Sequence, residues 1–169
     1  MRLFTCALLL VTAAVAQQRP NVDAQREAMK KLQFLVGKWS GEADVTRGPG
    51  EPLKITQTEN VQYRLDGMVM LVEGEGRNAD GKPVYSALAT IAFDDATGVY
   101  HFRAYNDGRY LDTELTVTAD GFSWGFTGGP VKVTNTMKLS DKGEWLETTD
   151  VTMGSQPPRR SVQMALKKQ

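Results

Sequence analysis

Cysteine and histidine are nearly absent from this chain of 169 residues, which contains one of each, Cys6 and His101. Zinc sites built from several Cys and His ligands are therefore excluded. A Ser-His-Asp hydrolase would have to use His101, yet the sequence lacks the Gly-x-Ser-x-Gly turn that presents the serine in α/β-hydrolases. The Asp-containing stretches NADGK and DDATG do not have the spacing of a calcium-binding loop. We expect no metal site.

An excess of charge of either sign is also missing, because 20 basic residues balance 20 acidic ones. Proteins that bind nucleic acid gather Lys and Arg into a stripe or patch that neutralises phosphates. No such basic stripe is present in the sequence. Nucleic acid is therefore not an expected partner.

Long apolar runs are confined to the first 16 residues, MRLFTCALLLVTAAVA. One basic residue, a short apolar run and the small-x-small sequence Ala14-Val15-Ala16 are typical of a secretory signal peptide. The run is shorter than the roughly 20 residues that a membrane-spanning helix needs. We predict a cleaved signal peptide over 1–16, a mature domain over 17–169, and a secreted or periplasmic location. An uncleaved N-terminal anchor is the alternative.

Cleavage would also remove Cys6, so the mature chain would fold without disulfides. After residue 16 no segment is apolar enough to cross a membrane as a helix. The mature length is that of one domain with a substantial hydrophobic core.

Residues 23–36, DAQREAMKKLQFLV, have the pattern of one amphipathic helix. Apolar residues recur at spacings of three and four, which places them on one face. Asp23 is the expected N-cap, Glu27 and Lys31 form an i,i+4 pair, and Gly37 is the expected C-terminal stop.

Beyond Gly37 the hydrophobic period changes from helical to two, and turn residues recur every ten to fifteen positions. Nine turns are expected, at 48–50, 66–67, 78–81, 94–98, 106–108, 120–121, 128–130, 140–143 and 154–158. They separate ten candidate strands, at 38–46, 53–65, 68–77, 84–93, 99–106, 109–119, 122–128, 131–139, 144–153 and 159–167. No second helix is present to connect parallel strands, so the sheet must be antiparallel.

Ten strands linked by hairpins leave two exposed edges unless the sheet closes on itself. The sequence therefore predicts an all-β fold, an antiparallel up-and-down β-barrel of about ten strands with the short N-terminal helix across one end. A sandwich of two sheets is the alternative.

Strand alternation proposes two faces for each strand but does not say which face points inward. Several faces combine large apolar side chains with a charge, as with Glu59 beside Val61 and Tyr63, or Arg103 beside His101 and Tyr105. An unpaired charge in a filled core costs several kcal/mol. These charges therefore lie either in a lumen that holds water or a ligand, or on the outer surface in cross-strand pairs.

The stretches LQFLVGKWSGEA (32–43) and ENVQYRLDGMVMLVEGEG (59–76) resemble a group of exported bacterial domains of lipocalin-like type. That group is similar to the wider calycin superfamily, which includes the nitrobindin-type ten-stranded barrels. In lipocalins a Gly-x-Trp opens the first strand and its Trp packs at the closed end of the barrel under a basic residue. The resemblance therefore implies that Trp39 plugs the barrel, with Arg159 or Arg160 as its stacked partner.

The same resemblance implies a small hydrophobic or amphipathic ligand and no known reaction. Nitrobindin-type proteins bind haem through a histidine late in the chain, and residues 151–169 contain none. Haem would require that His101, or a tyrosine such as Tyr105, point into the lumen. No cofactor is therefore expected.

Three functions remain open: a barrel that binds a ligand in its lumen, an enzyme that uses lumen carboxylates with Arg103, and a filled domain that binds a partner protein. For the first, the candidate lining residues are Tyr63, Met70, Phe102, Trp124 and Phe126, and the candidates that hold a polar head group are Glu59, Arg103 and Tyr105. The deciding observation is whether the face with Glu59, Arg103 and Tyr105 points into a cavity.

Overall fold

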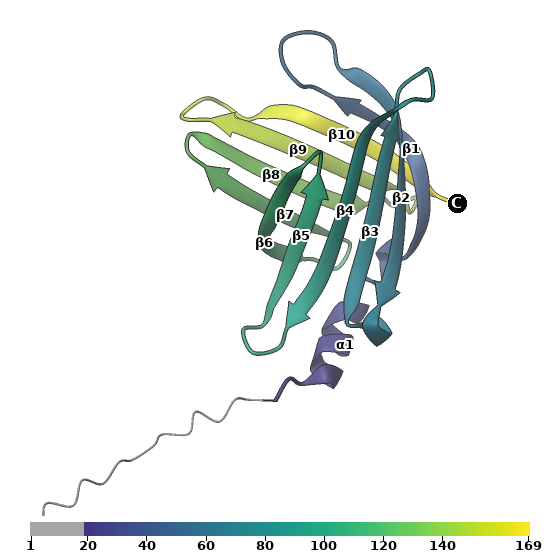
Figure 1. Cartoon of the computed structure of the whole chain (residues 1–169), viewed down its shortest axis with the longest axis vertical. Helices are drawn as coiled ribbons and strands as arrows, with labels where there is room; N and C mark the ends of the chain where they lie inside the picture. Colours follow the sequence, from purple (N-terminus) through teal and green to yellow (C-terminus); the bar gives the residue numbers. More distant parts are fainter. Residues whose placement is uncertain (1–18) are drawn as a thin grey trace, which may run out of the picture.

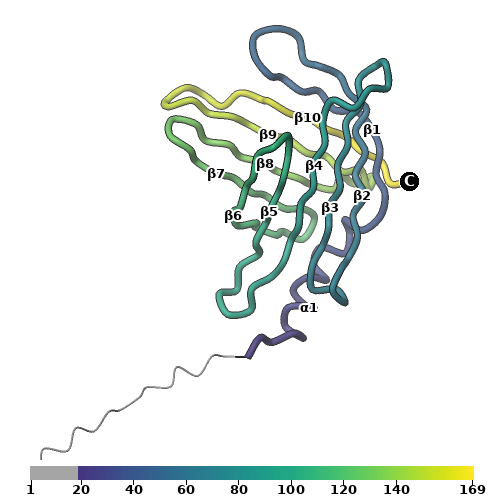
Figure 2. Tube along the Cα trace, viewed as in Figure 1, coloured from purple at the N-terminus to yellow at the C-terminus, as the bar shows by residue number. Residues whose placement is uncertain are grey.

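The chain folds into a closed barrel of ten antiparallel strands with a short helix at one end (Figures 1 and 2), which confirms the predicted fold class. The computed structural model describes residues 19–169, so the predicted signal peptide lies outside the described residues. The elements are α1 (Val22–Lys30), the 3₁₀ turn η1 (Gln33–Leu35), β1 (Gly37–Val45), β2 (Leu53–Arg64), the 3₁₀ turn η2 (Leu65–Gly67), β3 (Val69–Arg77), β4 (Pro83–Asp94), β5 (Val99–Asn106), β6 (Arg109–Val117), β7 (Gly121–Gly128), β8 (Val131–Leu139), β9 (Trp145–Met153) and β10 (Arg159–Lys168).

Each strand pairs with the next along the chain, and β1 closes the barrel by pairing with β10 from Trp39↔Lys168 to Val45↔Val162. Closure satisfies the backbone groups that the first and last strands would otherwise expose. The alternative of two stacked sheets is therefore wrong. All nine expected turns fall between paired strands. In the β5–β6 turn, for example, Asp107 and Gly108 have φ values of 47° and 76°, as a tight hairpin requires.

The N-terminal helix is shorter than the sequence predicts. It ends at Lys30, and the chain continues as a turn and η1 up to Leu35. Leu32 and Leu35 are both completely buried, and the tighter path of η1 turns the chain into the barrel before β1 begins.

Two local predictions for the helix are also wrong. The N-cap is Asn21, whose side chain accepts a hydrogen bond from the amide of Ala24 at 3.0 Å, whereas Asp23 lies in the first turn. Glu27 pairs with Lys30 at 2.6 Å and not with Lys31. Both differences follow from a helix that begins and ends earlier than its apolar pattern suggests.

Two tyrosines hold the end of α1 against the barrel. The hydroxyl of Tyr63 on β2 donates to the carbonyl of Met29 at 2.6 Å, and that of Tyr100 on β5 donates to the carbonyl of Ala28 at 2.7 Å. The last carbonyls of a helix have no partner within the helix. The carbonyls of Ala28 and Met29 accept from the amides of Lys31 and Leu32, at 3.2 and 3.0 Å. The tyrosines add a second bond to each carbonyl, and α1 covers one end of the barrel (Figure 1).

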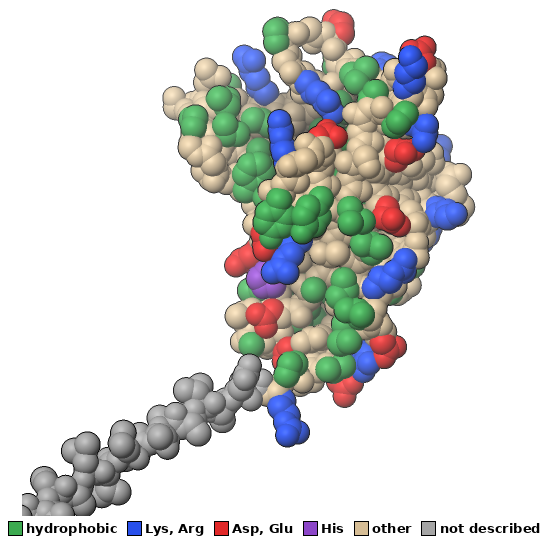
Figure 3. All heavy atoms as spheres, viewed as in Figure 1, with side chains coloured by type: hydrophobic (Ala, Val, Ile, Leu, Met, Phe, Trp, Pro, Cys, Tyr) green, Lys and Arg blue, Asp and Glu red, His purple; other side chains and the backbone are tan. Residues whose placement is uncertain are grey.

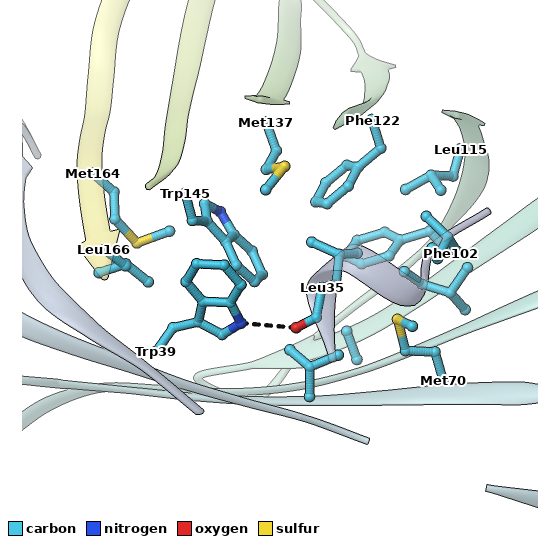
Figure 4. Packing of buried hydrophobic residues seen from close by; sticks show 14 of the residues in the cluster. Leu35, Trp39, Met70, Phe102, Leu115, Phe122, Met137, Trp145, Met164 and Leu166 are labelled. Atoms are coloured by element: carbon cyan, nitrogen blue, oxygen red, sulfur yellow. Dashed lines mark hydrogen bonds between the residues drawn. The ribbon is translucent and has the colours of Figure 1, made fainter. Parts of the chain in front are cut away.

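Trp39 packs inside the barrel at the end that α1 covers. Its indole donates to the carbonyl of Leu35 at 2.7 Å, and its ring meets Trp145 edge to face at 5.6 Å (Figure 4). The cation above the indole is Lys168, whose Nζ lies 5.2 Å from the ring centroid. Lys168 is paired with Trp39 in register, at the end of β10.

The structure does not bring Arg160 to Trp39. Arg160 lies at the start of β10, and because β10 runs antiparallel to β1 this is the opposite end of the barrel. Its guanidinium pairs with the carboxylate of Asp150 at 2.6 Å on the outer face. Antiparallel pairing makes the last residues of β10 the neighbours of the first residues of β1.

The barrel wall is weakest between β6 and β7. These strands pair at three positions, from Leu115↔Trp124 to Val117↔Phe122, whereas β7 and β8 pair at eight. Beyond Leu115 the hydroxyl of Thr113 still donates to the carbonyl of Gly125 at 2.7 Å. In Figures 1 and 2 strands β7–β10 run at a steep angle to β3–β5, which places this seam where the wall changes direction.

The outer face of the barrel in Figure 3 carries intermixed acidic and basic side chains without a large area of one sign. Among residues 19–169, no helix combines the length and the apolar character needed to cross a membrane.

We predict that Trp39→Ala lowers the free energy of unfolding by about 3–5 kcal/mol, because the indole is 2 % exposed and its loss leaves a large cavity. Urea unfolding followed by circular dichroism measures the change. Tyr105→Ala is the control, since that ring is 55 % exposed and its removal should cost no more than about 1 kcal/mol. Equal costs for the two variants would contradict the role of Trp39 as a plug.

Candidate functional site

The inner face of the barrel divides into an apolar floor and a partly empty lumen. The floor consists of buried side chains from the helix, η1 and several strands, including Met29, Leu32, Leu35, Trp39, Val61, Met70, Met137 and Leu166. Above this floor inward residues become small on β3 and β4, where Gly74, Ala87 and Ala89 face the interior. Small side chains on adjacent strands leave space between the walls, so the lumen is not filled.

Two cavities occupy the lumen, with volumes of about 780 Å³ and about 310 Å³. The larger is lined mainly by apolar and aromatic side chains, among them Ile91, Phe102, Phe122 and Phe126. The smaller lies toward β1, β2 and β10. Glu59, Tyr85, Trp124 and Glu147 line both cavities. These four residues therefore mark the place where the two chambers meet.

Glu59 on β2 is one of two carboxyl groups on the inner face. Its Oε1 accepts a hydrogen bond from Nε2 of Gln57 at 2.8 Å. Gly74 lies opposite Glu59 in the β2–β3 register. A Cβ atom at position 74 would lie 2.7 Å from a Glu59 carboxyl oxygen, so the absence of a side chain at Gly74 gives the carboxyl its space.

Glu147 on β9 is the second inward carboxyl group. Its Oε1 accepts from Nδ2 of Asn135 at 2.8 Å, and its Oε2 accepts from Nε1 of Trp145 at 2.8 Å. Asn135 also donates to the hydroxyl of Thr149 at 2.9 Å. Its own Oδ1 is buried and has no hydrogen-bond partner. A buried acceptor without a partner is costly, and it indicates a place for a donor from water or a ligand.

Burial shapes the acid–base behaviour of this cluster. Desolvation raises the pKa of Glu59 to about 8, with a smaller contribution from the nearby carboxylate of Glu147, while the hydrogen bond from Gln57 opposes the rise. Desolvation also raises the pKa of Glu147, against the hydrogen bonds from Asn135 and Trp145. Desolvation, followed by the charges of Glu59 and Glu147, raises the pKa of Tyr85. At neutral pH the empty site therefore favours the protonated form of Glu59, and burial disfavours the charged form of Glu147.

Positive charge is found at the rim of the lumen and not beside the two carboxyl groups. Arg109 at the start of β6 lines the larger cavity, and Arg47 in the β1–β2 loop lines the smaller one. Both positions are at the end of the barrel away from α1. The salt bridges found within residues 19–169 include neither Glu59 nor Glu147.

The structure brings together four of the eight candidate ligand-binding residues. Glu59, Phe102, Trp124 and Phe126 line the larger cavity, and the rings of Phe102 and Trp124 stack at 5.2 Å. Tyr63 and Met70 face inward but belong to the floor, where Tyr63 binds the helix and Met70 is completely buried.

The other two candidates lie outside the barrel. Arg103 and Tyr105 alternate with the inward residues Phe102 and Ala104, so their side chains face solvent. Arg103 pairs with Asp112 across the β5–β6 hairpin at 3.0 Å, and Tyr105 packs against Tyr110. Glu59 therefore lies on the inner face of the barrel, whereas Arg103 and Tyr105 lie on the outer face. An enzyme that combines lumen carboxylates with Arg103 is not compatible with this arrangement.

His101 shares the outward face of β5 with Arg103 and Tyr105, since Tyr100 and Phe102 on either side of it point inward. Neither His101 nor Tyr105 lines the two lumen cavities. The two side chains considered as haem ligands therefore do not fit a group bound inside the barrel.

Sequence reasoning did not select Glu147, Tyr85 or Asn135. A signal for Glu147 is its spacing of two from Trp145, which places a carboxyl in phase with a large aromatic residue on the same face. The Gly74-x-Gly76 pair is a signal that the neighbouring strand leaves space for large polar side chains, because a Cβ at position 76 would meet Gln57 at 2.8 Å.

These features define the class of protein: a closed ten-stranded antiparallel barrel whose apolar lumen contains two desolvated carboxyl groups. Residues 24–168 match the DUF1579 family, described as proteins of unknown function, and the chain belongs to this family. No curated protein matches the sequence.

Among solved structures, the crystal structure of Rv2717c from M. tuberculosis is similar, with a TM-score of 0.64. The two chains are 16 % identical, and the match covers 84 % of this chain and 97 % of that chain. At this level of identity the similarity shows a shared fold alone.

We predict that the pH dependence of stability reveals the buried state of Glu59. With a pKa near 4.5 in the unfolded chain and about 8 in the folded one, folding retains a proton between these values. The contribution of Glu59 to stability is fully present below pH 4.5 and is lost as the pH rises toward 8, by about 1.4 kcal/mol per pH unit for one proton.

Glu59→Gln removes this titration and keeps the shape of the side chain. The free energy of unfolding of the variant, measured in urea between pH 5 and pH 8, should therefore fall less steeply than that of the unmodified chain. Glu42→Gln, an exposed residue on β1, is the control. Parallel profiles for the Glu59→Gln variant and the unmodified chain would show that Glu59 is not desolvated.

Proposed function

We propose that this protein binds a small, largely apolar molecule in the lumen, with a polar group of the ligand at the junction formed by Glu59, Tyr85 and Glu147. Apolar cavities of several hundred Å³ with a few convergent polar groups are the usual form of small-molecule sites. The larger cavity has about 780 Å³ and fits this description.

One observation carries the proposal: two inward carboxyl groups face an apolar cavity, and no Lys or Arg pairs with them within the described part of the chain. Unpaired buried acids lower the stability of a barrel, because each one loses its hydration, so a barrel with a purely structural role would gain nothing from them. A ligand that makes hydrogen bonds to them offsets this loss in the bound state.

The stacked pair of Phe102 and Trp124 supports the same assignment. The two rings are 5.2 Å apart at an interplanar angle of 18°, and both line the larger cavity. A rigid aromatic wall offers a large contact area at a low cost in side-chain entropy. The ligand body would pack on this wall while its polar group reaches the acids.

The predicted export belongs to the same proposal, because a ligand carrier outside the cytoplasm fits the signal peptide that the sequence predicts. Expression of the full chain in a bacterial host with a periplasm tests this point. The intact mass of the periplasmic product should be that of a chain that begins at Gln17. A product that retains residues 1–16 would support the N-terminal anchor instead.

We predict that filling the lumen abolishes binding without unfolding the barrel. Ala87 on β4 lines the larger cavity, and Leu88 next to it is 41 % exposed on the outer face. Ala87→Trp should remove co-purifying small molecules and binding of apolar probes, whereas Leu88→Trp should leave both intact. The cavity is large enough for the indole of Ala87→Trp, and the indole of Leu88→Trp would lie on the outer face, so both variants should fold.

Native mass spectrometry of the exported protein detects the bound molecule, and titration with octanol or phenylbutanol measures binding to the extracted protein. Circular dichroism confirms that each variant is folded. Equal binding by the two tryptophan variants would place any binding site outside the lumen. The absence of bound material and of probe binding in the unmodified chain would overturn the proposed function.

A further inference from the structure

The amide and indole side chains of the polar wall have used their N–H donors. An Asn side chain has two N–H groups, and those of Asn135 go to Glu147 and Thr149. The amide of Gln57 donates to Glu59 and, at 3.4 Å, to the carbonyl of Thr58. The single N–H of Trp145 goes to Glu147. These side chains have no N–H left for a ligand.

Acceptors remain available in the same place. Oδ1 of Asn135 is buried without a partner, and only one of the two oxygens of Glu59 accepts a hydrogen bond from the described residues. The two carboxyl groups lie on β2 and β9, which β1 and β10 separate in the closed strand order, and they are close enough for the charge of Glu147 to affect Glu59. These free acceptors suit a ligand that donates hydrogen bonds.

Aromatic faces surround these acceptors. Trp124 and Tyr85 line both chambers, and Phe102 and Trp145 line the larger one. Aromatic faces attract cations through their quadrupole, most strongly where water is excluded. Cationic side chains reach the cavities at the rim, as Arg47 and Arg109, and within residues 19–169 none pairs with the acids.

We propose that the lumen ligand is an organic amine, an ammonium group on an apolar body, whose N–H groups are held by Glu59, Glu147 and Oδ1 of Asn135. This inference rests on the proposed function and names the chemical class of its ligand. An ammonium group has no acceptor and donates in up to three directions. It therefore matches the free acceptors of the wall, and its positive charge stabilises a carboxylate there once a proton has left.

Binding must also balance protons. At neutral pH Glu59 holds its proton in the empty barrel, so an ammonium ligand displaces that proton and leaves a carboxylate. The groups that act on Glu59 are Gln57 on its own strand and Glu147 on β9, and Glu59 itself acts on Tyr85 on β4. Tyr85 in turn is affected by Asp107 in the β5–β6 turn and Arg47 in the β1–β2 loop. One positive charge suits one carboxylate with the second acid protonated.

The test compares ligands that share a body and differ in the head group. Isothermal titration calorimetry of the mature chain uses phenylbutylamine, phenylbutanol and phenylbutyrate, together with octylamine, octanol and octanoate. The amine in each set should bind about tenfold to hundredfold more tightly than its alcohol, as expected for hydrogen bonds to charged groups. The carboxylate should bind most weakly, because the apolar lumen disfavours its charge and no cationic side chain of the described residues pairs with it at the two acids.

Proton release gives an independent readout. Amine titrations at pH 7 in phosphate and in Tris buffer should differ in apparent enthalpy by the amount expected for release of about one proton. The affinity should increase by up to tenfold per pH unit between pH 6 and pH 8. The alcohols should show neither effect.

The variants separate charge from shape. Glu59→Gln and Glu147→Gln should each remove most of the preference for amine over alcohol and leave alcohol binding nearly unchanged. Gly74→Ala, whose Cβ would displace the carboxyl of Glu59, should weaken amine binding without removing an acid. Glu42→Gln on the outer face of β1 is the matched control and should behave as the unmodified chain.

The outcomes distinguish this inference from the proposed function. Alcohols that bind as tightly as amines, or amine binding without proton release, would overturn the amine assignment and leave lumen binding intact. Tighter binding of the carboxylates would move the head group to Arg47 and Arg109 and would also overturn it. Failure of all six compounds to bind the unmodified chain, together with the absence of co-purifying material, would overturn both.

Discussion

Three hydrogen bonds that connect the N-terminal segment to the barrel set the position of everything in the lumen. Tyr63 and Tyr100 bind the last carbonyls of α1, and Trp39 binds the carbonyl of Leu35. The tyrosine bonds add to the backbone bonds that the carbonyls of Ala28 and Met29 already accept, and the indole of Trp39 donates to the carbonyl of Leu35. They place Leu35 at the bottom of the lumen, and the cavity begins above it. Without this floor the barrel would be open at both ends.

The closed floor gives the carboxyl groups their chemistry. Water cannot reach Glu59 and Glu147 from the helix end, and apolar and aromatic side chains line much of the larger cavity above it. Desolvation is the largest cause of the raised pKa values of both residues. Gly74 and Gly76 on β3 contribute by leaving the space that Glu59 and Gln57 occupy. The lumen therefore disfavours the charged form of both carboxyl groups, while its shape leaves room for their side chains.

The fold was almost entirely predictable from the sequence, whereas only four of the eight candidate ligand-binding residues line the larger cavity. Turn residues such as Asp107-Gly108 have local causes, since positive φ angles depend on the residue itself, and so all nine turns were predicted. No local feature of the sequence decides which face of β5 points inward. Phe102 and Arg103 alternate equally well in either orientation, and the choice depends on Trp124 and Asp112 on other strands. Arg103 and Tyr105 were predicted to face the lumen and face solvent instead, because tertiary contacts decide which face of β5 points inward.

The sequence by itself determined the strand order, the antiparallel pairing and the need for closure, because period-two patterns and short turns leave few other topologies. Only the tertiary structure decided which cation covers Trp39, since the answer depends on the register between β1 and β10, and Lys168 lies there in place of Arg160. In the same way Glu59 and Glu147 are 88 positions apart in the chain and become neighbours only when the barrel closes around them. Contacts between distant strands are set by packing, and packing is a property of the whole fold.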